Sequence, residues 1–212
     1  MLVRDILTPG VITISPETTL PDAIRLARER GVRHLPVTED GKLVGIVSDR
    51  DLKQAMASPA TSLDVHELKY LLDRLAVGEL MTRAVITIGP TAPVEEAARL
   101  MVTEKISALP VMDGDRLLGI VTETDVLNLF LKGMGAGEPS SRLDVALEDR
   151  PGTLGEILRT VEATGARVSS IMTLTDRAGR REAVIRIATI HPAPVVEALT
   201  ARGYAVRQPW RG

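Results

Sequence analysis

The chain contains one nine-residue pattern twice, as LVGIVSDRD at residues 43–51 and as LLGIVTETD at residues 117–125. The likeness extends further, because residues 3–52 align without a gap on residues 77–126, at a constant offset of 74 (77 − 3 = 74). Both copies also share VITI, a proline two residues later, and LPV. Similarity in this order predicts two copies of one supersecondary unit that bury a shared core.

Each copy is predicted to form a short strand, a helix, two strands and a second helix. In the first copy the short strand is VITI (11–14), and a helix follows Thr19, which forms a capping-box pattern with Asp22 and precedes a stop at Gly31. The runs HLPVT and KLVGIVS are strands separated by the hairpin signal EDGK, and DRDLKQAMA is the second helix. An extra helix is expected in the insertion between the copies (58–80).

The chain changes character after residue 132. KGMGAGEPSS is rich in glycine and predicts a flexible linker; its G-x-G-x-G lacks a preceding strand and is followed by Pro139, which argues against a phosphate loop. From residue 142 the predicted order is β-α-β-β-α-β, that of a ferredoxin-like sandwich. The fold class is therefore α/β (α+β), with expected domains at 1–76, 77–132 and 142–212 and a linker at 133–141.

Composition excludes several kinds of protein. The 212 residues include no cysteine, so disulfides, thiolate nucleophiles and cysteine-bound zinc are excluded, and the three histidines show no ligand spacing that would indicate a metal site. A net charge of −2 and 2% aromatic residues do not favour a nucleic-acid or membrane partner. The start MLVRDILTPG lacks the apolar run of a signal peptide, and no later stretch could span a bilayer, so we expect a cytoplasmic protein.

A hydroxyl and a carboxylate stand three residues apart where a strand meets a helix in each copy, as Ser48 with Asp51 and as Thr122 with Asp125. One interpretation is structural, because S/T-x-x-D is a helix capping box. The other is a nucleotide site, because a helix N-terminus and a hydroxyl suit a phosphate while an acidic side chain can accept from ribose hydroxyls. The recurrence of both pairs, and the glycine of the preceding GIV where a ligand needs room, favour the second.

With these motifs, residues 1–132 resemble tandem cystathionine-β-synthase (CBS) domains, the pair called a Bateman module. The resemblance implies a module that binds adenine nucleotides (AMP, ADP, ATP) or related adenosyl ligands in clefts between the copies. It also implies that each aspartate works with the first strand of the other copy. The residues so implied at the site of Asp125 are Thr8, Val11 and Ile12, with Thr122 near phosphate; those at the site of Asp51 are Thr82, Val85 and Ile86, with Ser48 near phosphate.

The two copies differ where ligand phosphates would lie. The first carries Arg33, His34 and Arg50, and the second carries the less basic set Ser107, Ala108 and Thr124. This difference predicts that one cleft prefers more highly charged nucleotides, although the sequence does not say which aspartate the basic residues serve. The alternative is that Arg33 and His34 are ordinary residues at a strand edge.

LEDRPGTLGEI (147–157) resembles the start of an ACT domain, a regulatory module that often binds amino acids, and the resemblance covers residues 142–212. It implies an amino-acid site at the turn formed by Asp149, Arg150, Pro151, Gly152, Thr153 and Leu154. Arg167 stands where amino-acid-binding members often carry asparagine, so the domain has dimerisation as its alternative role. A CBS pair followed by an ACT domain resembles acetoin-utilisation AcuB-type proteins.

The sequence therefore favours a non-catalytic regulatory sensor that uses the nucleotide as a regulatory ligand, needs no cofactor, forms a homodimer and signals to a separate target protein. Two rivals stay open. An enzyme acting on the bound nucleotide would need a nucleophile–base pair, a metal cluster or a P-loop, and none is evident. A nucleic-acid-binding regulator would need a basic stripe, whereas the basic residues are scattered.

Overall fold

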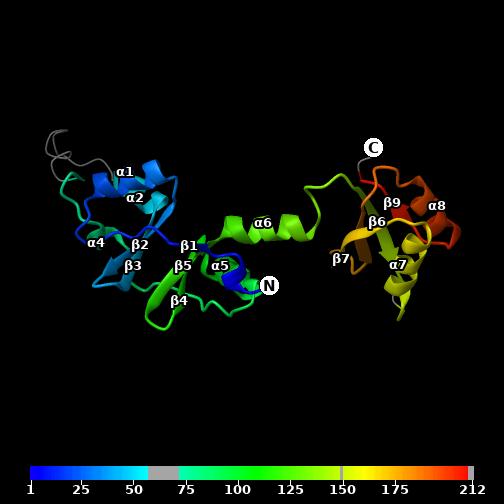
Figure 1. Cartoon of the computed structure of the whole chain (residues 1–212), viewed down its shortest axis with the longest axis horizontal. Coiled ribbons are helices and arrows are strands. Elements are labelled where there is room, and N and C mark those ends of the chain that lie inside the picture. The colour runs from blue at the N-terminus through cyan, green and yellow to red at the C-terminus, as the bar shows by residue number, and fades with distance from the viewer. Residues whose placement is uncertain (57–71, 149, 210–212) are drawn as a thin grey trace. The chain divides into compact units, whose positions relative to one another are not determined.

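The computed structural model describes residues 1–56, 72–148 and 150–209 and divides into two compact units, Met1–Val126 and Leu127–Gly212. Figure 1 shows the helices and strands of both units. Residues 57–71, which include the first part of the extra helix expected in the insertion, lie outside the described residues, and the described end of the insertion contains the short helix α4 (Val77–Leu80). Among the described helices, none is long and apolar enough to cross a membrane.

The first unit contains the two copies, each built around an antiparallel hairpin. Its elements in the first copy are η1 (Val3–Asp5), β1 (Thr8–Pro9), α1 (Leu20–Arg30), β2 (His34–Glu39), β3 (Lys42–Ser48) and α2 (Asp49–Met56). Those of the second copy are α4 (Val77–Leu80), α5 (Val94–Glu104), β4 (Ala108–Asp113), β5 (Arg116–Thr122) and α6 (Glu123–Gly133), of which α6 continues past the boundary of the unit.

Local chemistry sets most of these boundaries as the sequence predicts. The Thr19 hydroxyl accepts the backbone N–H of Asp22 (3.4 Å) at the start of α1, and Gly31 ends the helix at φ 63°. The β2–β3 turn places Asp40 (φ 48°) and Gly41 (φ 77°) in the left-handed region, as a two-residue hairpin requires. The predicted helix and hairpin of the first copy are therefore confirmed.

The predicted strand VITI is wrong as a strand. In each copy only its last residue is bridged, Ile14 to Val37 and Ile88 to Val111, each in a parallel bridge. Ile14 donates to the carbonyl of Pro36 (3.1 Å) and accepts from Thr38 (2.8 Å). The alternating pattern reflects burial of Ile14 (7% exposed) and Ile88 (6%) against the cores, not a continuous ladder.

The short strand lies earlier in the chain and belongs to the other copy's sheet. Thr8 and Pro9 pair with Ile120 and Gly119 of β5, and Thr82 forms the corresponding bridge with Ile46 of β3. The first segment of each copy, around Thr8 and around Thr82, therefore pairs with a strand of the other copy; we call these two the crossing segments. This exchange ties the two copies into one unit.

The glycine of each GIV serves this exchange and not a ligand, which corrects the sequence interpretation. A Cβ on Gly119 would collide with the carbonyl oxygen of Thr8 and lie 2.6 Å from Leu7, and a Cβ on Gly45 would collide with the Met81 side chain. The space beside both glycines is therefore filled by the crossing segments themselves.

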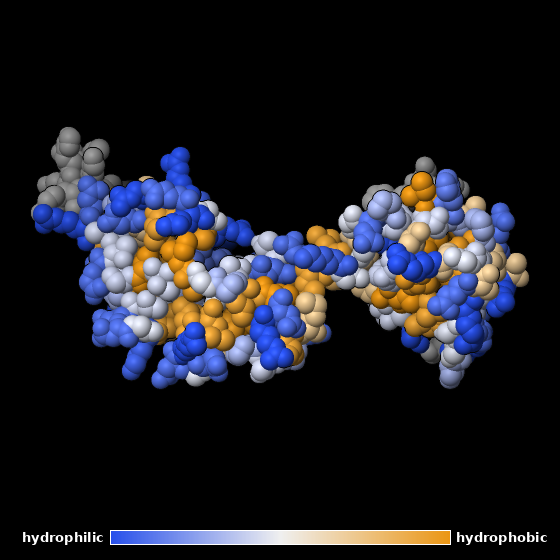
Figure 2. All heavy atoms as spheres, viewed as in Figure 1, coloured by the Kyte–Doolittle hydropathy of each residue, from blue (hydrophilic) through white to orange (hydrophobic). Residues whose placement is uncertain are grey.

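Each copy has its own apolar core. Around Leu20, Leu35 and Val47, the first core packs α1, α2 and the hairpin β2–β3, and around Met101, Leu109 and Val121 the second packs α5 and the hairpin β4–β5. In α6, by contrast, none of the eleven residues is buried, and Leu127, Phe130 and Leu131 are each at least half exposed. Apolar atoms accordingly reach the surface along this helix (Figure 2).

The second unit has the predicted β-α-β-β-α-β order. Its elements are β6 (Ser141–Leu147), α7 (Thr153–Ala163), β7 (Val168–Thr175), β8 (Arg181–Ile187), α8 (Ala193–Ala201) and β9 (Val206–Arg207). The sheet is antiparallel in the order β7-β8-β6-β9, and both helices lie on one face of it (Figure 1). Leu143, Ile157, Ile185 and Leu199, all fully buried, form the core between the two layers.

The segment expected to be a flexible linker is held against this unit. Ser170 on β7 donates to the Met134 carbonyl (2.8 Å), and Arg186 on β8 donates to the Ser140 hydroxyl (3.0 Å). Residues from both halves of the segment are therefore attached to one sheet.

The two glycines of the exchange provide a matched test of it. We expect Gly119→Ala to lower the free energy of unfolding by about 1–3 kcal/mol, because the added methyl group meets backbone that cannot move alone. Gly45→Ala should cost clearly less, because the Met81 side chain can rotate away. Urea unfolding of both variants measures the difference; equal losses would contradict the close approach of β1 to β5.

Candidate functional site

The hydroxyl–carboxylate pairs form the same closed arrangement in both copies. The backbone N–H and hydroxyl of Ser48 donate to Asp51 Oδ2 (2.8 and 2.6 Å), and the Asp51 N–H donates back to the hydroxyl (3.3 Å). Thr122 and Asp125 repeat these bonds at 2.8, 2.6 and 3.4 Å. Each pair therefore forms a helix capping box, called a box below. Both bonds to each carboxylate use Oδ2, so Oδ1 takes no part in the box.

The exchange of first segments brings predicted site residues to the motif of the other copy. Thr8 pairs with Ile120, two residues before Thr122, and Thr82 bridges Ile46, two residues before Ser48. Both threonines are exposed. The structure therefore places each threonine at the strand that leads to the aspartate named for it in the sequence.

The other predicted residues lie in less direct positions. Val11, Ile12, Val85 and Ile86 are half-buried, with Ile12 packed on the first core and Ile86 on the second. Arg50 is exposed on α2. Ala108 is 6% exposed in β4, opposite Thr122, and presents no polar side-chain atom.

Arg33 and His34 lie at the junction of the two copies. The Arg33 guanidinium donates from Nη2 to the Thr124 hydroxyl (3.1 Å), inside the motif of the second copy. His34 Nε2 is 2.8 Å from the Ser107 hydroxyl, while its own backbone pairs with Ser48 in the first copy. The basic residues of the first copy therefore touch the motif regions of both copies.

Groups at this junction shift the pKa of His34. Burial, and after it the positive charge of Arg33, lower the pKa of His34 below 6.5, while the carboxylates of Asp51, Glu123 and Asp49 act in the opposite direction. Asp49 and Glu123 are not among the site residues that the sequence predicts. Their signal was an acidic residue directly after the hydroxyl in both copies, at the first position of each helix.

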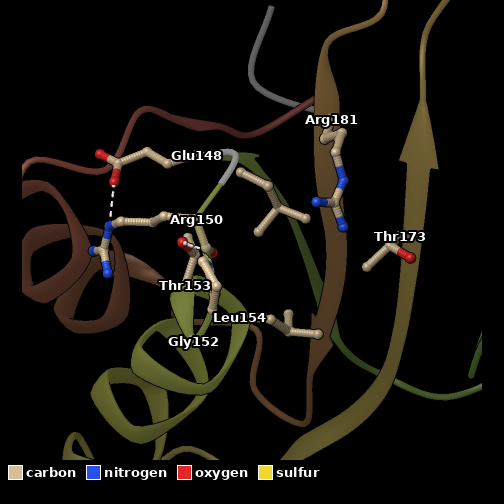
Figure 3. Close-up of a pocket in the computed structure, with 9 residues that line it drawn as sticks. Glu148, Arg150, Gly152, Thr153, Leu154, Thr173 and Arg181 are labelled. Carbon is tan, nitrogen blue, oxygen red and sulfur yellow. Dashed lines mark hydrogen bonds and ion pairs between the residues drawn. The ribbon is translucent and has the colours of Figure 1, made fainter.

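The turn before α7 lines a separate cavity of about 350 Å³ in the second unit. Arg150, Pro151, Gly152, Thr153 and Leu154 line it, and Asp149 lies outside the described residues. Thr173 on β7 and Arg181 on β8 stand across from the turn (Figure 3).

Ion pairs hold the arginine of this turn. Arg150 donates to Glu148 (2.7 Å) and to both carboxylate oxygens of Glu156 (3.0 and 2.7 Å), and Tyr204 donates to Glu156 (2.9 Å). The Arg150 guanidinium and then the Tyr204 hydroxyl lower the pKa of Glu156 to about 2. Arg150 is therefore already balanced by carboxylates.

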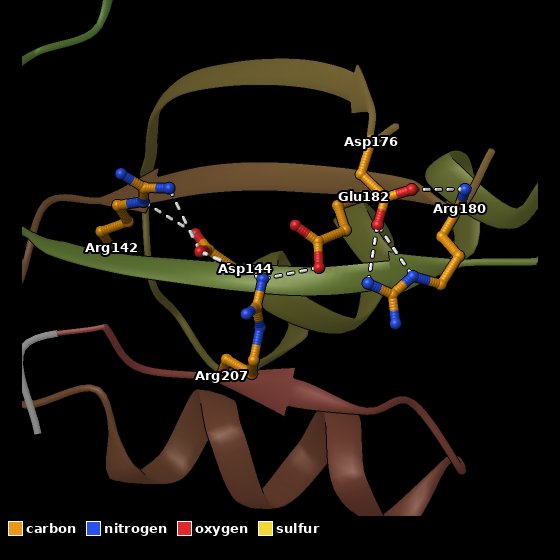
Figure 4. A network of polar contacts seen from close by, with 6 residues as sticks. All are labelled: Arg142, Asp144, Asp176, Arg180, Glu182 and Arg207. Carbon is orange, nitrogen blue, oxygen red and sulfur yellow. Dashed lines mark hydrogen bonds and ion pairs between the residues drawn. The ribbon is translucent and has the colours of Figure 1, made fainter. Parts of the chain in front are cut away.

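A second cavity, of about 420 Å³, lies on the sheet face opposite the helices. Asp144, only 6% exposed, is bound by both Nε and Nη2 of Arg142 (2.7 and 3.1 Å), and Arg207 pairs with Glu182 at 2.6 Å (Figure 4). These charges compensate one another and leave this face polar. No group of three or more metal-ligand side chains occurs in the part of the chain that the structure describes.

The sequence model of the CBS domain matches the duplicated unit, once at residues 3–58 and once at 77–132. The chain belongs to the CBS domain family. The match covers each copy with its hairpin and its hydroxyl–carboxylate pair, and so the duplicated unit is a CBS pair.

Solved CBS pairs resemble this one along nearly their whole length. The pair of protein MJ0100, in complex with 5′-methylthioadenosine and S-adenosyl-L-methionine, is 32% identical with a TM-score of 0.54, and the match covers 65% of this chain and 98% of that one. CBSX2, in complex with AMP, is 35% identical with a TM-score of 0.52, covering 62% and 97%. An acetoin utilization protein (AcuB) from Vibrio cholerae is 32% identical with a TM-score of 0.53, covering 66% and 98%.

We expect His34 to titrate below pH 6.5 in the free protein, and Arg33→Ala to move its midpoint upward, because the substitution removes a nearby positive charge. Folding thus favours the neutral ring, so the contribution of His34 to stability is complete above pH 6.5 and is lost as the pH falls. NMR titration of the ring proton, assigned with His34→Gln, measures both midpoints. A midpoint at or above 6.5 would contradict the burial of His34 at the junction.

Proposed function

We propose that this protein is a non-catalytic regulatory sensor whose CBS pair binds adenine nucleotides or a related adenosyl ligand. The observation that carries the proposal is the pair of hydroxyl–carboxylate boxes, each adjoined by the first segment of the other copy. Two similar pairs hold AMP or adenosyl compounds, which supports the same ligand class here.

In this proposal the capping box orients the aspartate for its ligand. The Ser48 and Thr122 hydroxyls hold Oδ2 of Asp51 and Asp125 at 2.6 Å, so that Oδ1 accepts from ribose hydroxyls. A carboxylate fixed in advance loses little side-chain entropy when the ligand arrives. Adenine would lie against the crossing segments of Thr8 or Thr82, and phosphates would lie toward Arg33 and His34.

A catalytic role receives less support. Each hydroxyl is already engaged in its own helix cap, because it donates to the aspartate carboxylate and accepts the N–H of the same residue. The ligand would therefore leave the protein unchanged, and its effect would pass through conformation or assembly to a target protein.

We further propose that the second unit is an ACT domain. The D-R-P-G turn, the sheet order β7-β8-β6-β9 and the two helices on one face support this assignment. The cavity at the turn supports a small amino acid as its ligand, and dimerisation is its other proposed role. With the similarity of the CBS pair to AcuB, this domain order supports an AcuB-type regulator.

Asp51→Asn and Asp125→Asn test the nucleotide site directly. Each should weaken adenosine binding tenfold or more, because a hydrogen bond to a charged acceptor contributes about 1.5–3 kcal/mol. Their stability should change by about 1 kcal/mol or less, the usual value of a cap. Calorimetric titration measures the first effect and thermal unfolding the second.

The matched control is Asp22→Asn, because Thr19 and Asp22 form the same type of box (2.8 Å) at the start of α1. It should lose a similar amount of stability and bind adenosine normally. If all three variants lose stability and still bind adenosine with the affinity of the wild type, the boxes are helix caps only.

We expect a closed homodimer. β7 is an edge strand of eight residues without charge or proline, and α6 exposes three large apolar side chains; a second copy of the chain would cover both. Light scattering at micromolar concentration should give twice the mass of one chain. Ile171→Lys in β7 should weaken the dimer, whereas Thr200→Lys on α8 should not, and a monomeric wild type would refute the proposal.

A further inference from the structure

Arg33 contacts the starts of two helices that belong to different copies. Its carbonyl accepts the N–H of Asp49, the first residue of α2 (2.9 Å), and its guanidinium donates to Thr124 in the first turn of α6 (3.1 Å). The helix of the first box and the helix of the second box are therefore joined through one residue.

Ser107 makes the reciprocal connection. It occupies the position of Arg33 in the second copy (107 − 33 = 74). Its carbonyl accepts the N–H of Glu123, the first residue of α6 (3.1 Å), and its hydroxyl bonds His34 Nε2 (2.8 Å). Two hydrogen bonds, 91 and 73 residues apart in sequence, thus cross the junction between the boxes.

At the two positions whose side chains cross this junction from the first copy, both residues are basic types. Arg33 and His34 are matched in the second copy by Ser107 and Ala108, which carry no charge. The carboxylates of Asp49, Asp51 and Glu123 also act on His34. A second anion at the junction would therefore be repelled by the first anion and by these carboxylates. The second copy has Ser107, not a second arginine, at the position equivalent to Arg33, so this repulsion would not be compensated there.

We propose that Arg33 and His34 form one anion-binding pair shared by both nucleotide clefts, so that a phosphate-bearing ligand in one cleft weakens the binding of a second in the other. The inference rests on the proposed nucleotide function. The backbone of Arg33 contacts α2 and its side chain contacts α6. Arg33 therefore binds the phosphate of whichever cleft is occupied first. Ligands without phosphate, such as adenosine, make no use of the pair and bind the two clefts independently.

The test compares ADP and adenosine binding by calorimetry on the full chain. Asp51→Asn and Asp125→Asn each leave one cleft intact, and each is combined with Arg33→Ala. Sharing predicts that Arg33→Ala weakens ADP binding about tenfold in both backgrounds and leaves adenosine binding unchanged, which also shows that the variants are folded. In the wild type, the second ADP should bind at least tenfold more weakly than the first, and the two adenosines should bind independently.

Arg28→Ala, which removes the same charge from an exposed position on α1, is the matched control and should leave all affinities unchanged. If Arg33→Ala weakens ADP in only one background, Arg33 serves a single cleft and the inference is wrong, although the nucleotide function stands. Two ADP molecules that bind the wild type with equal affinity would also overturn it. A wild type that binds neither ADP nor adenosine would instead refute the proposed function.

Discussion

The reciprocal pairing of the first segments is the constraint on which the rest of the CBS pair depends. Thr8 pairs with β5 of the second copy, and Thr82 forms a bridge with β3 of the first. This is possible only because Gly45 and Gly119 leave space for the crossing chain. A small repeat that would bury little surface alone thereby becomes half of one compact unit.

The same exchange assembles the candidate site. Each strand that receives a crossing segment continues directly into a hydroxyl–carboxylate box, so the segment of one copy and the box of the other converge. The box fixes its aspartate in the first turn of a helix, whose dipole places a partial positive charge at the same point. Capping and ligand binding are therefore compatible uses of Asp51 and Asp125, because the cap occupies Oδ2 and leaves Oδ1 outside it.

The parts of the structure that the sequence predicted are those with local causes. The cap at Thr19, the stop at Gly31 and the hairpin turn each follow from residues a few positions apart. VITI failed as a strand because alternating burial does not reveal which backbone groups find partners. The partners of Gly45 and Gly119 and the contact of Arg33 with Thr124 depend on segments distant in sequence, which one sequence without structural context does not specify.

The proposal that the two boxes of the CBS pair are nucleotide sites is tested by a crystal structure of the full chain with AMP. We expect adenine beside the crossing segment of Thr8 or Thr82 and ribose hydroxyls within hydrogen-bond distance of Asp125 or Asp51. AMP bound elsewhere, with both carboxylates engaged only by their own caps, would contradict it.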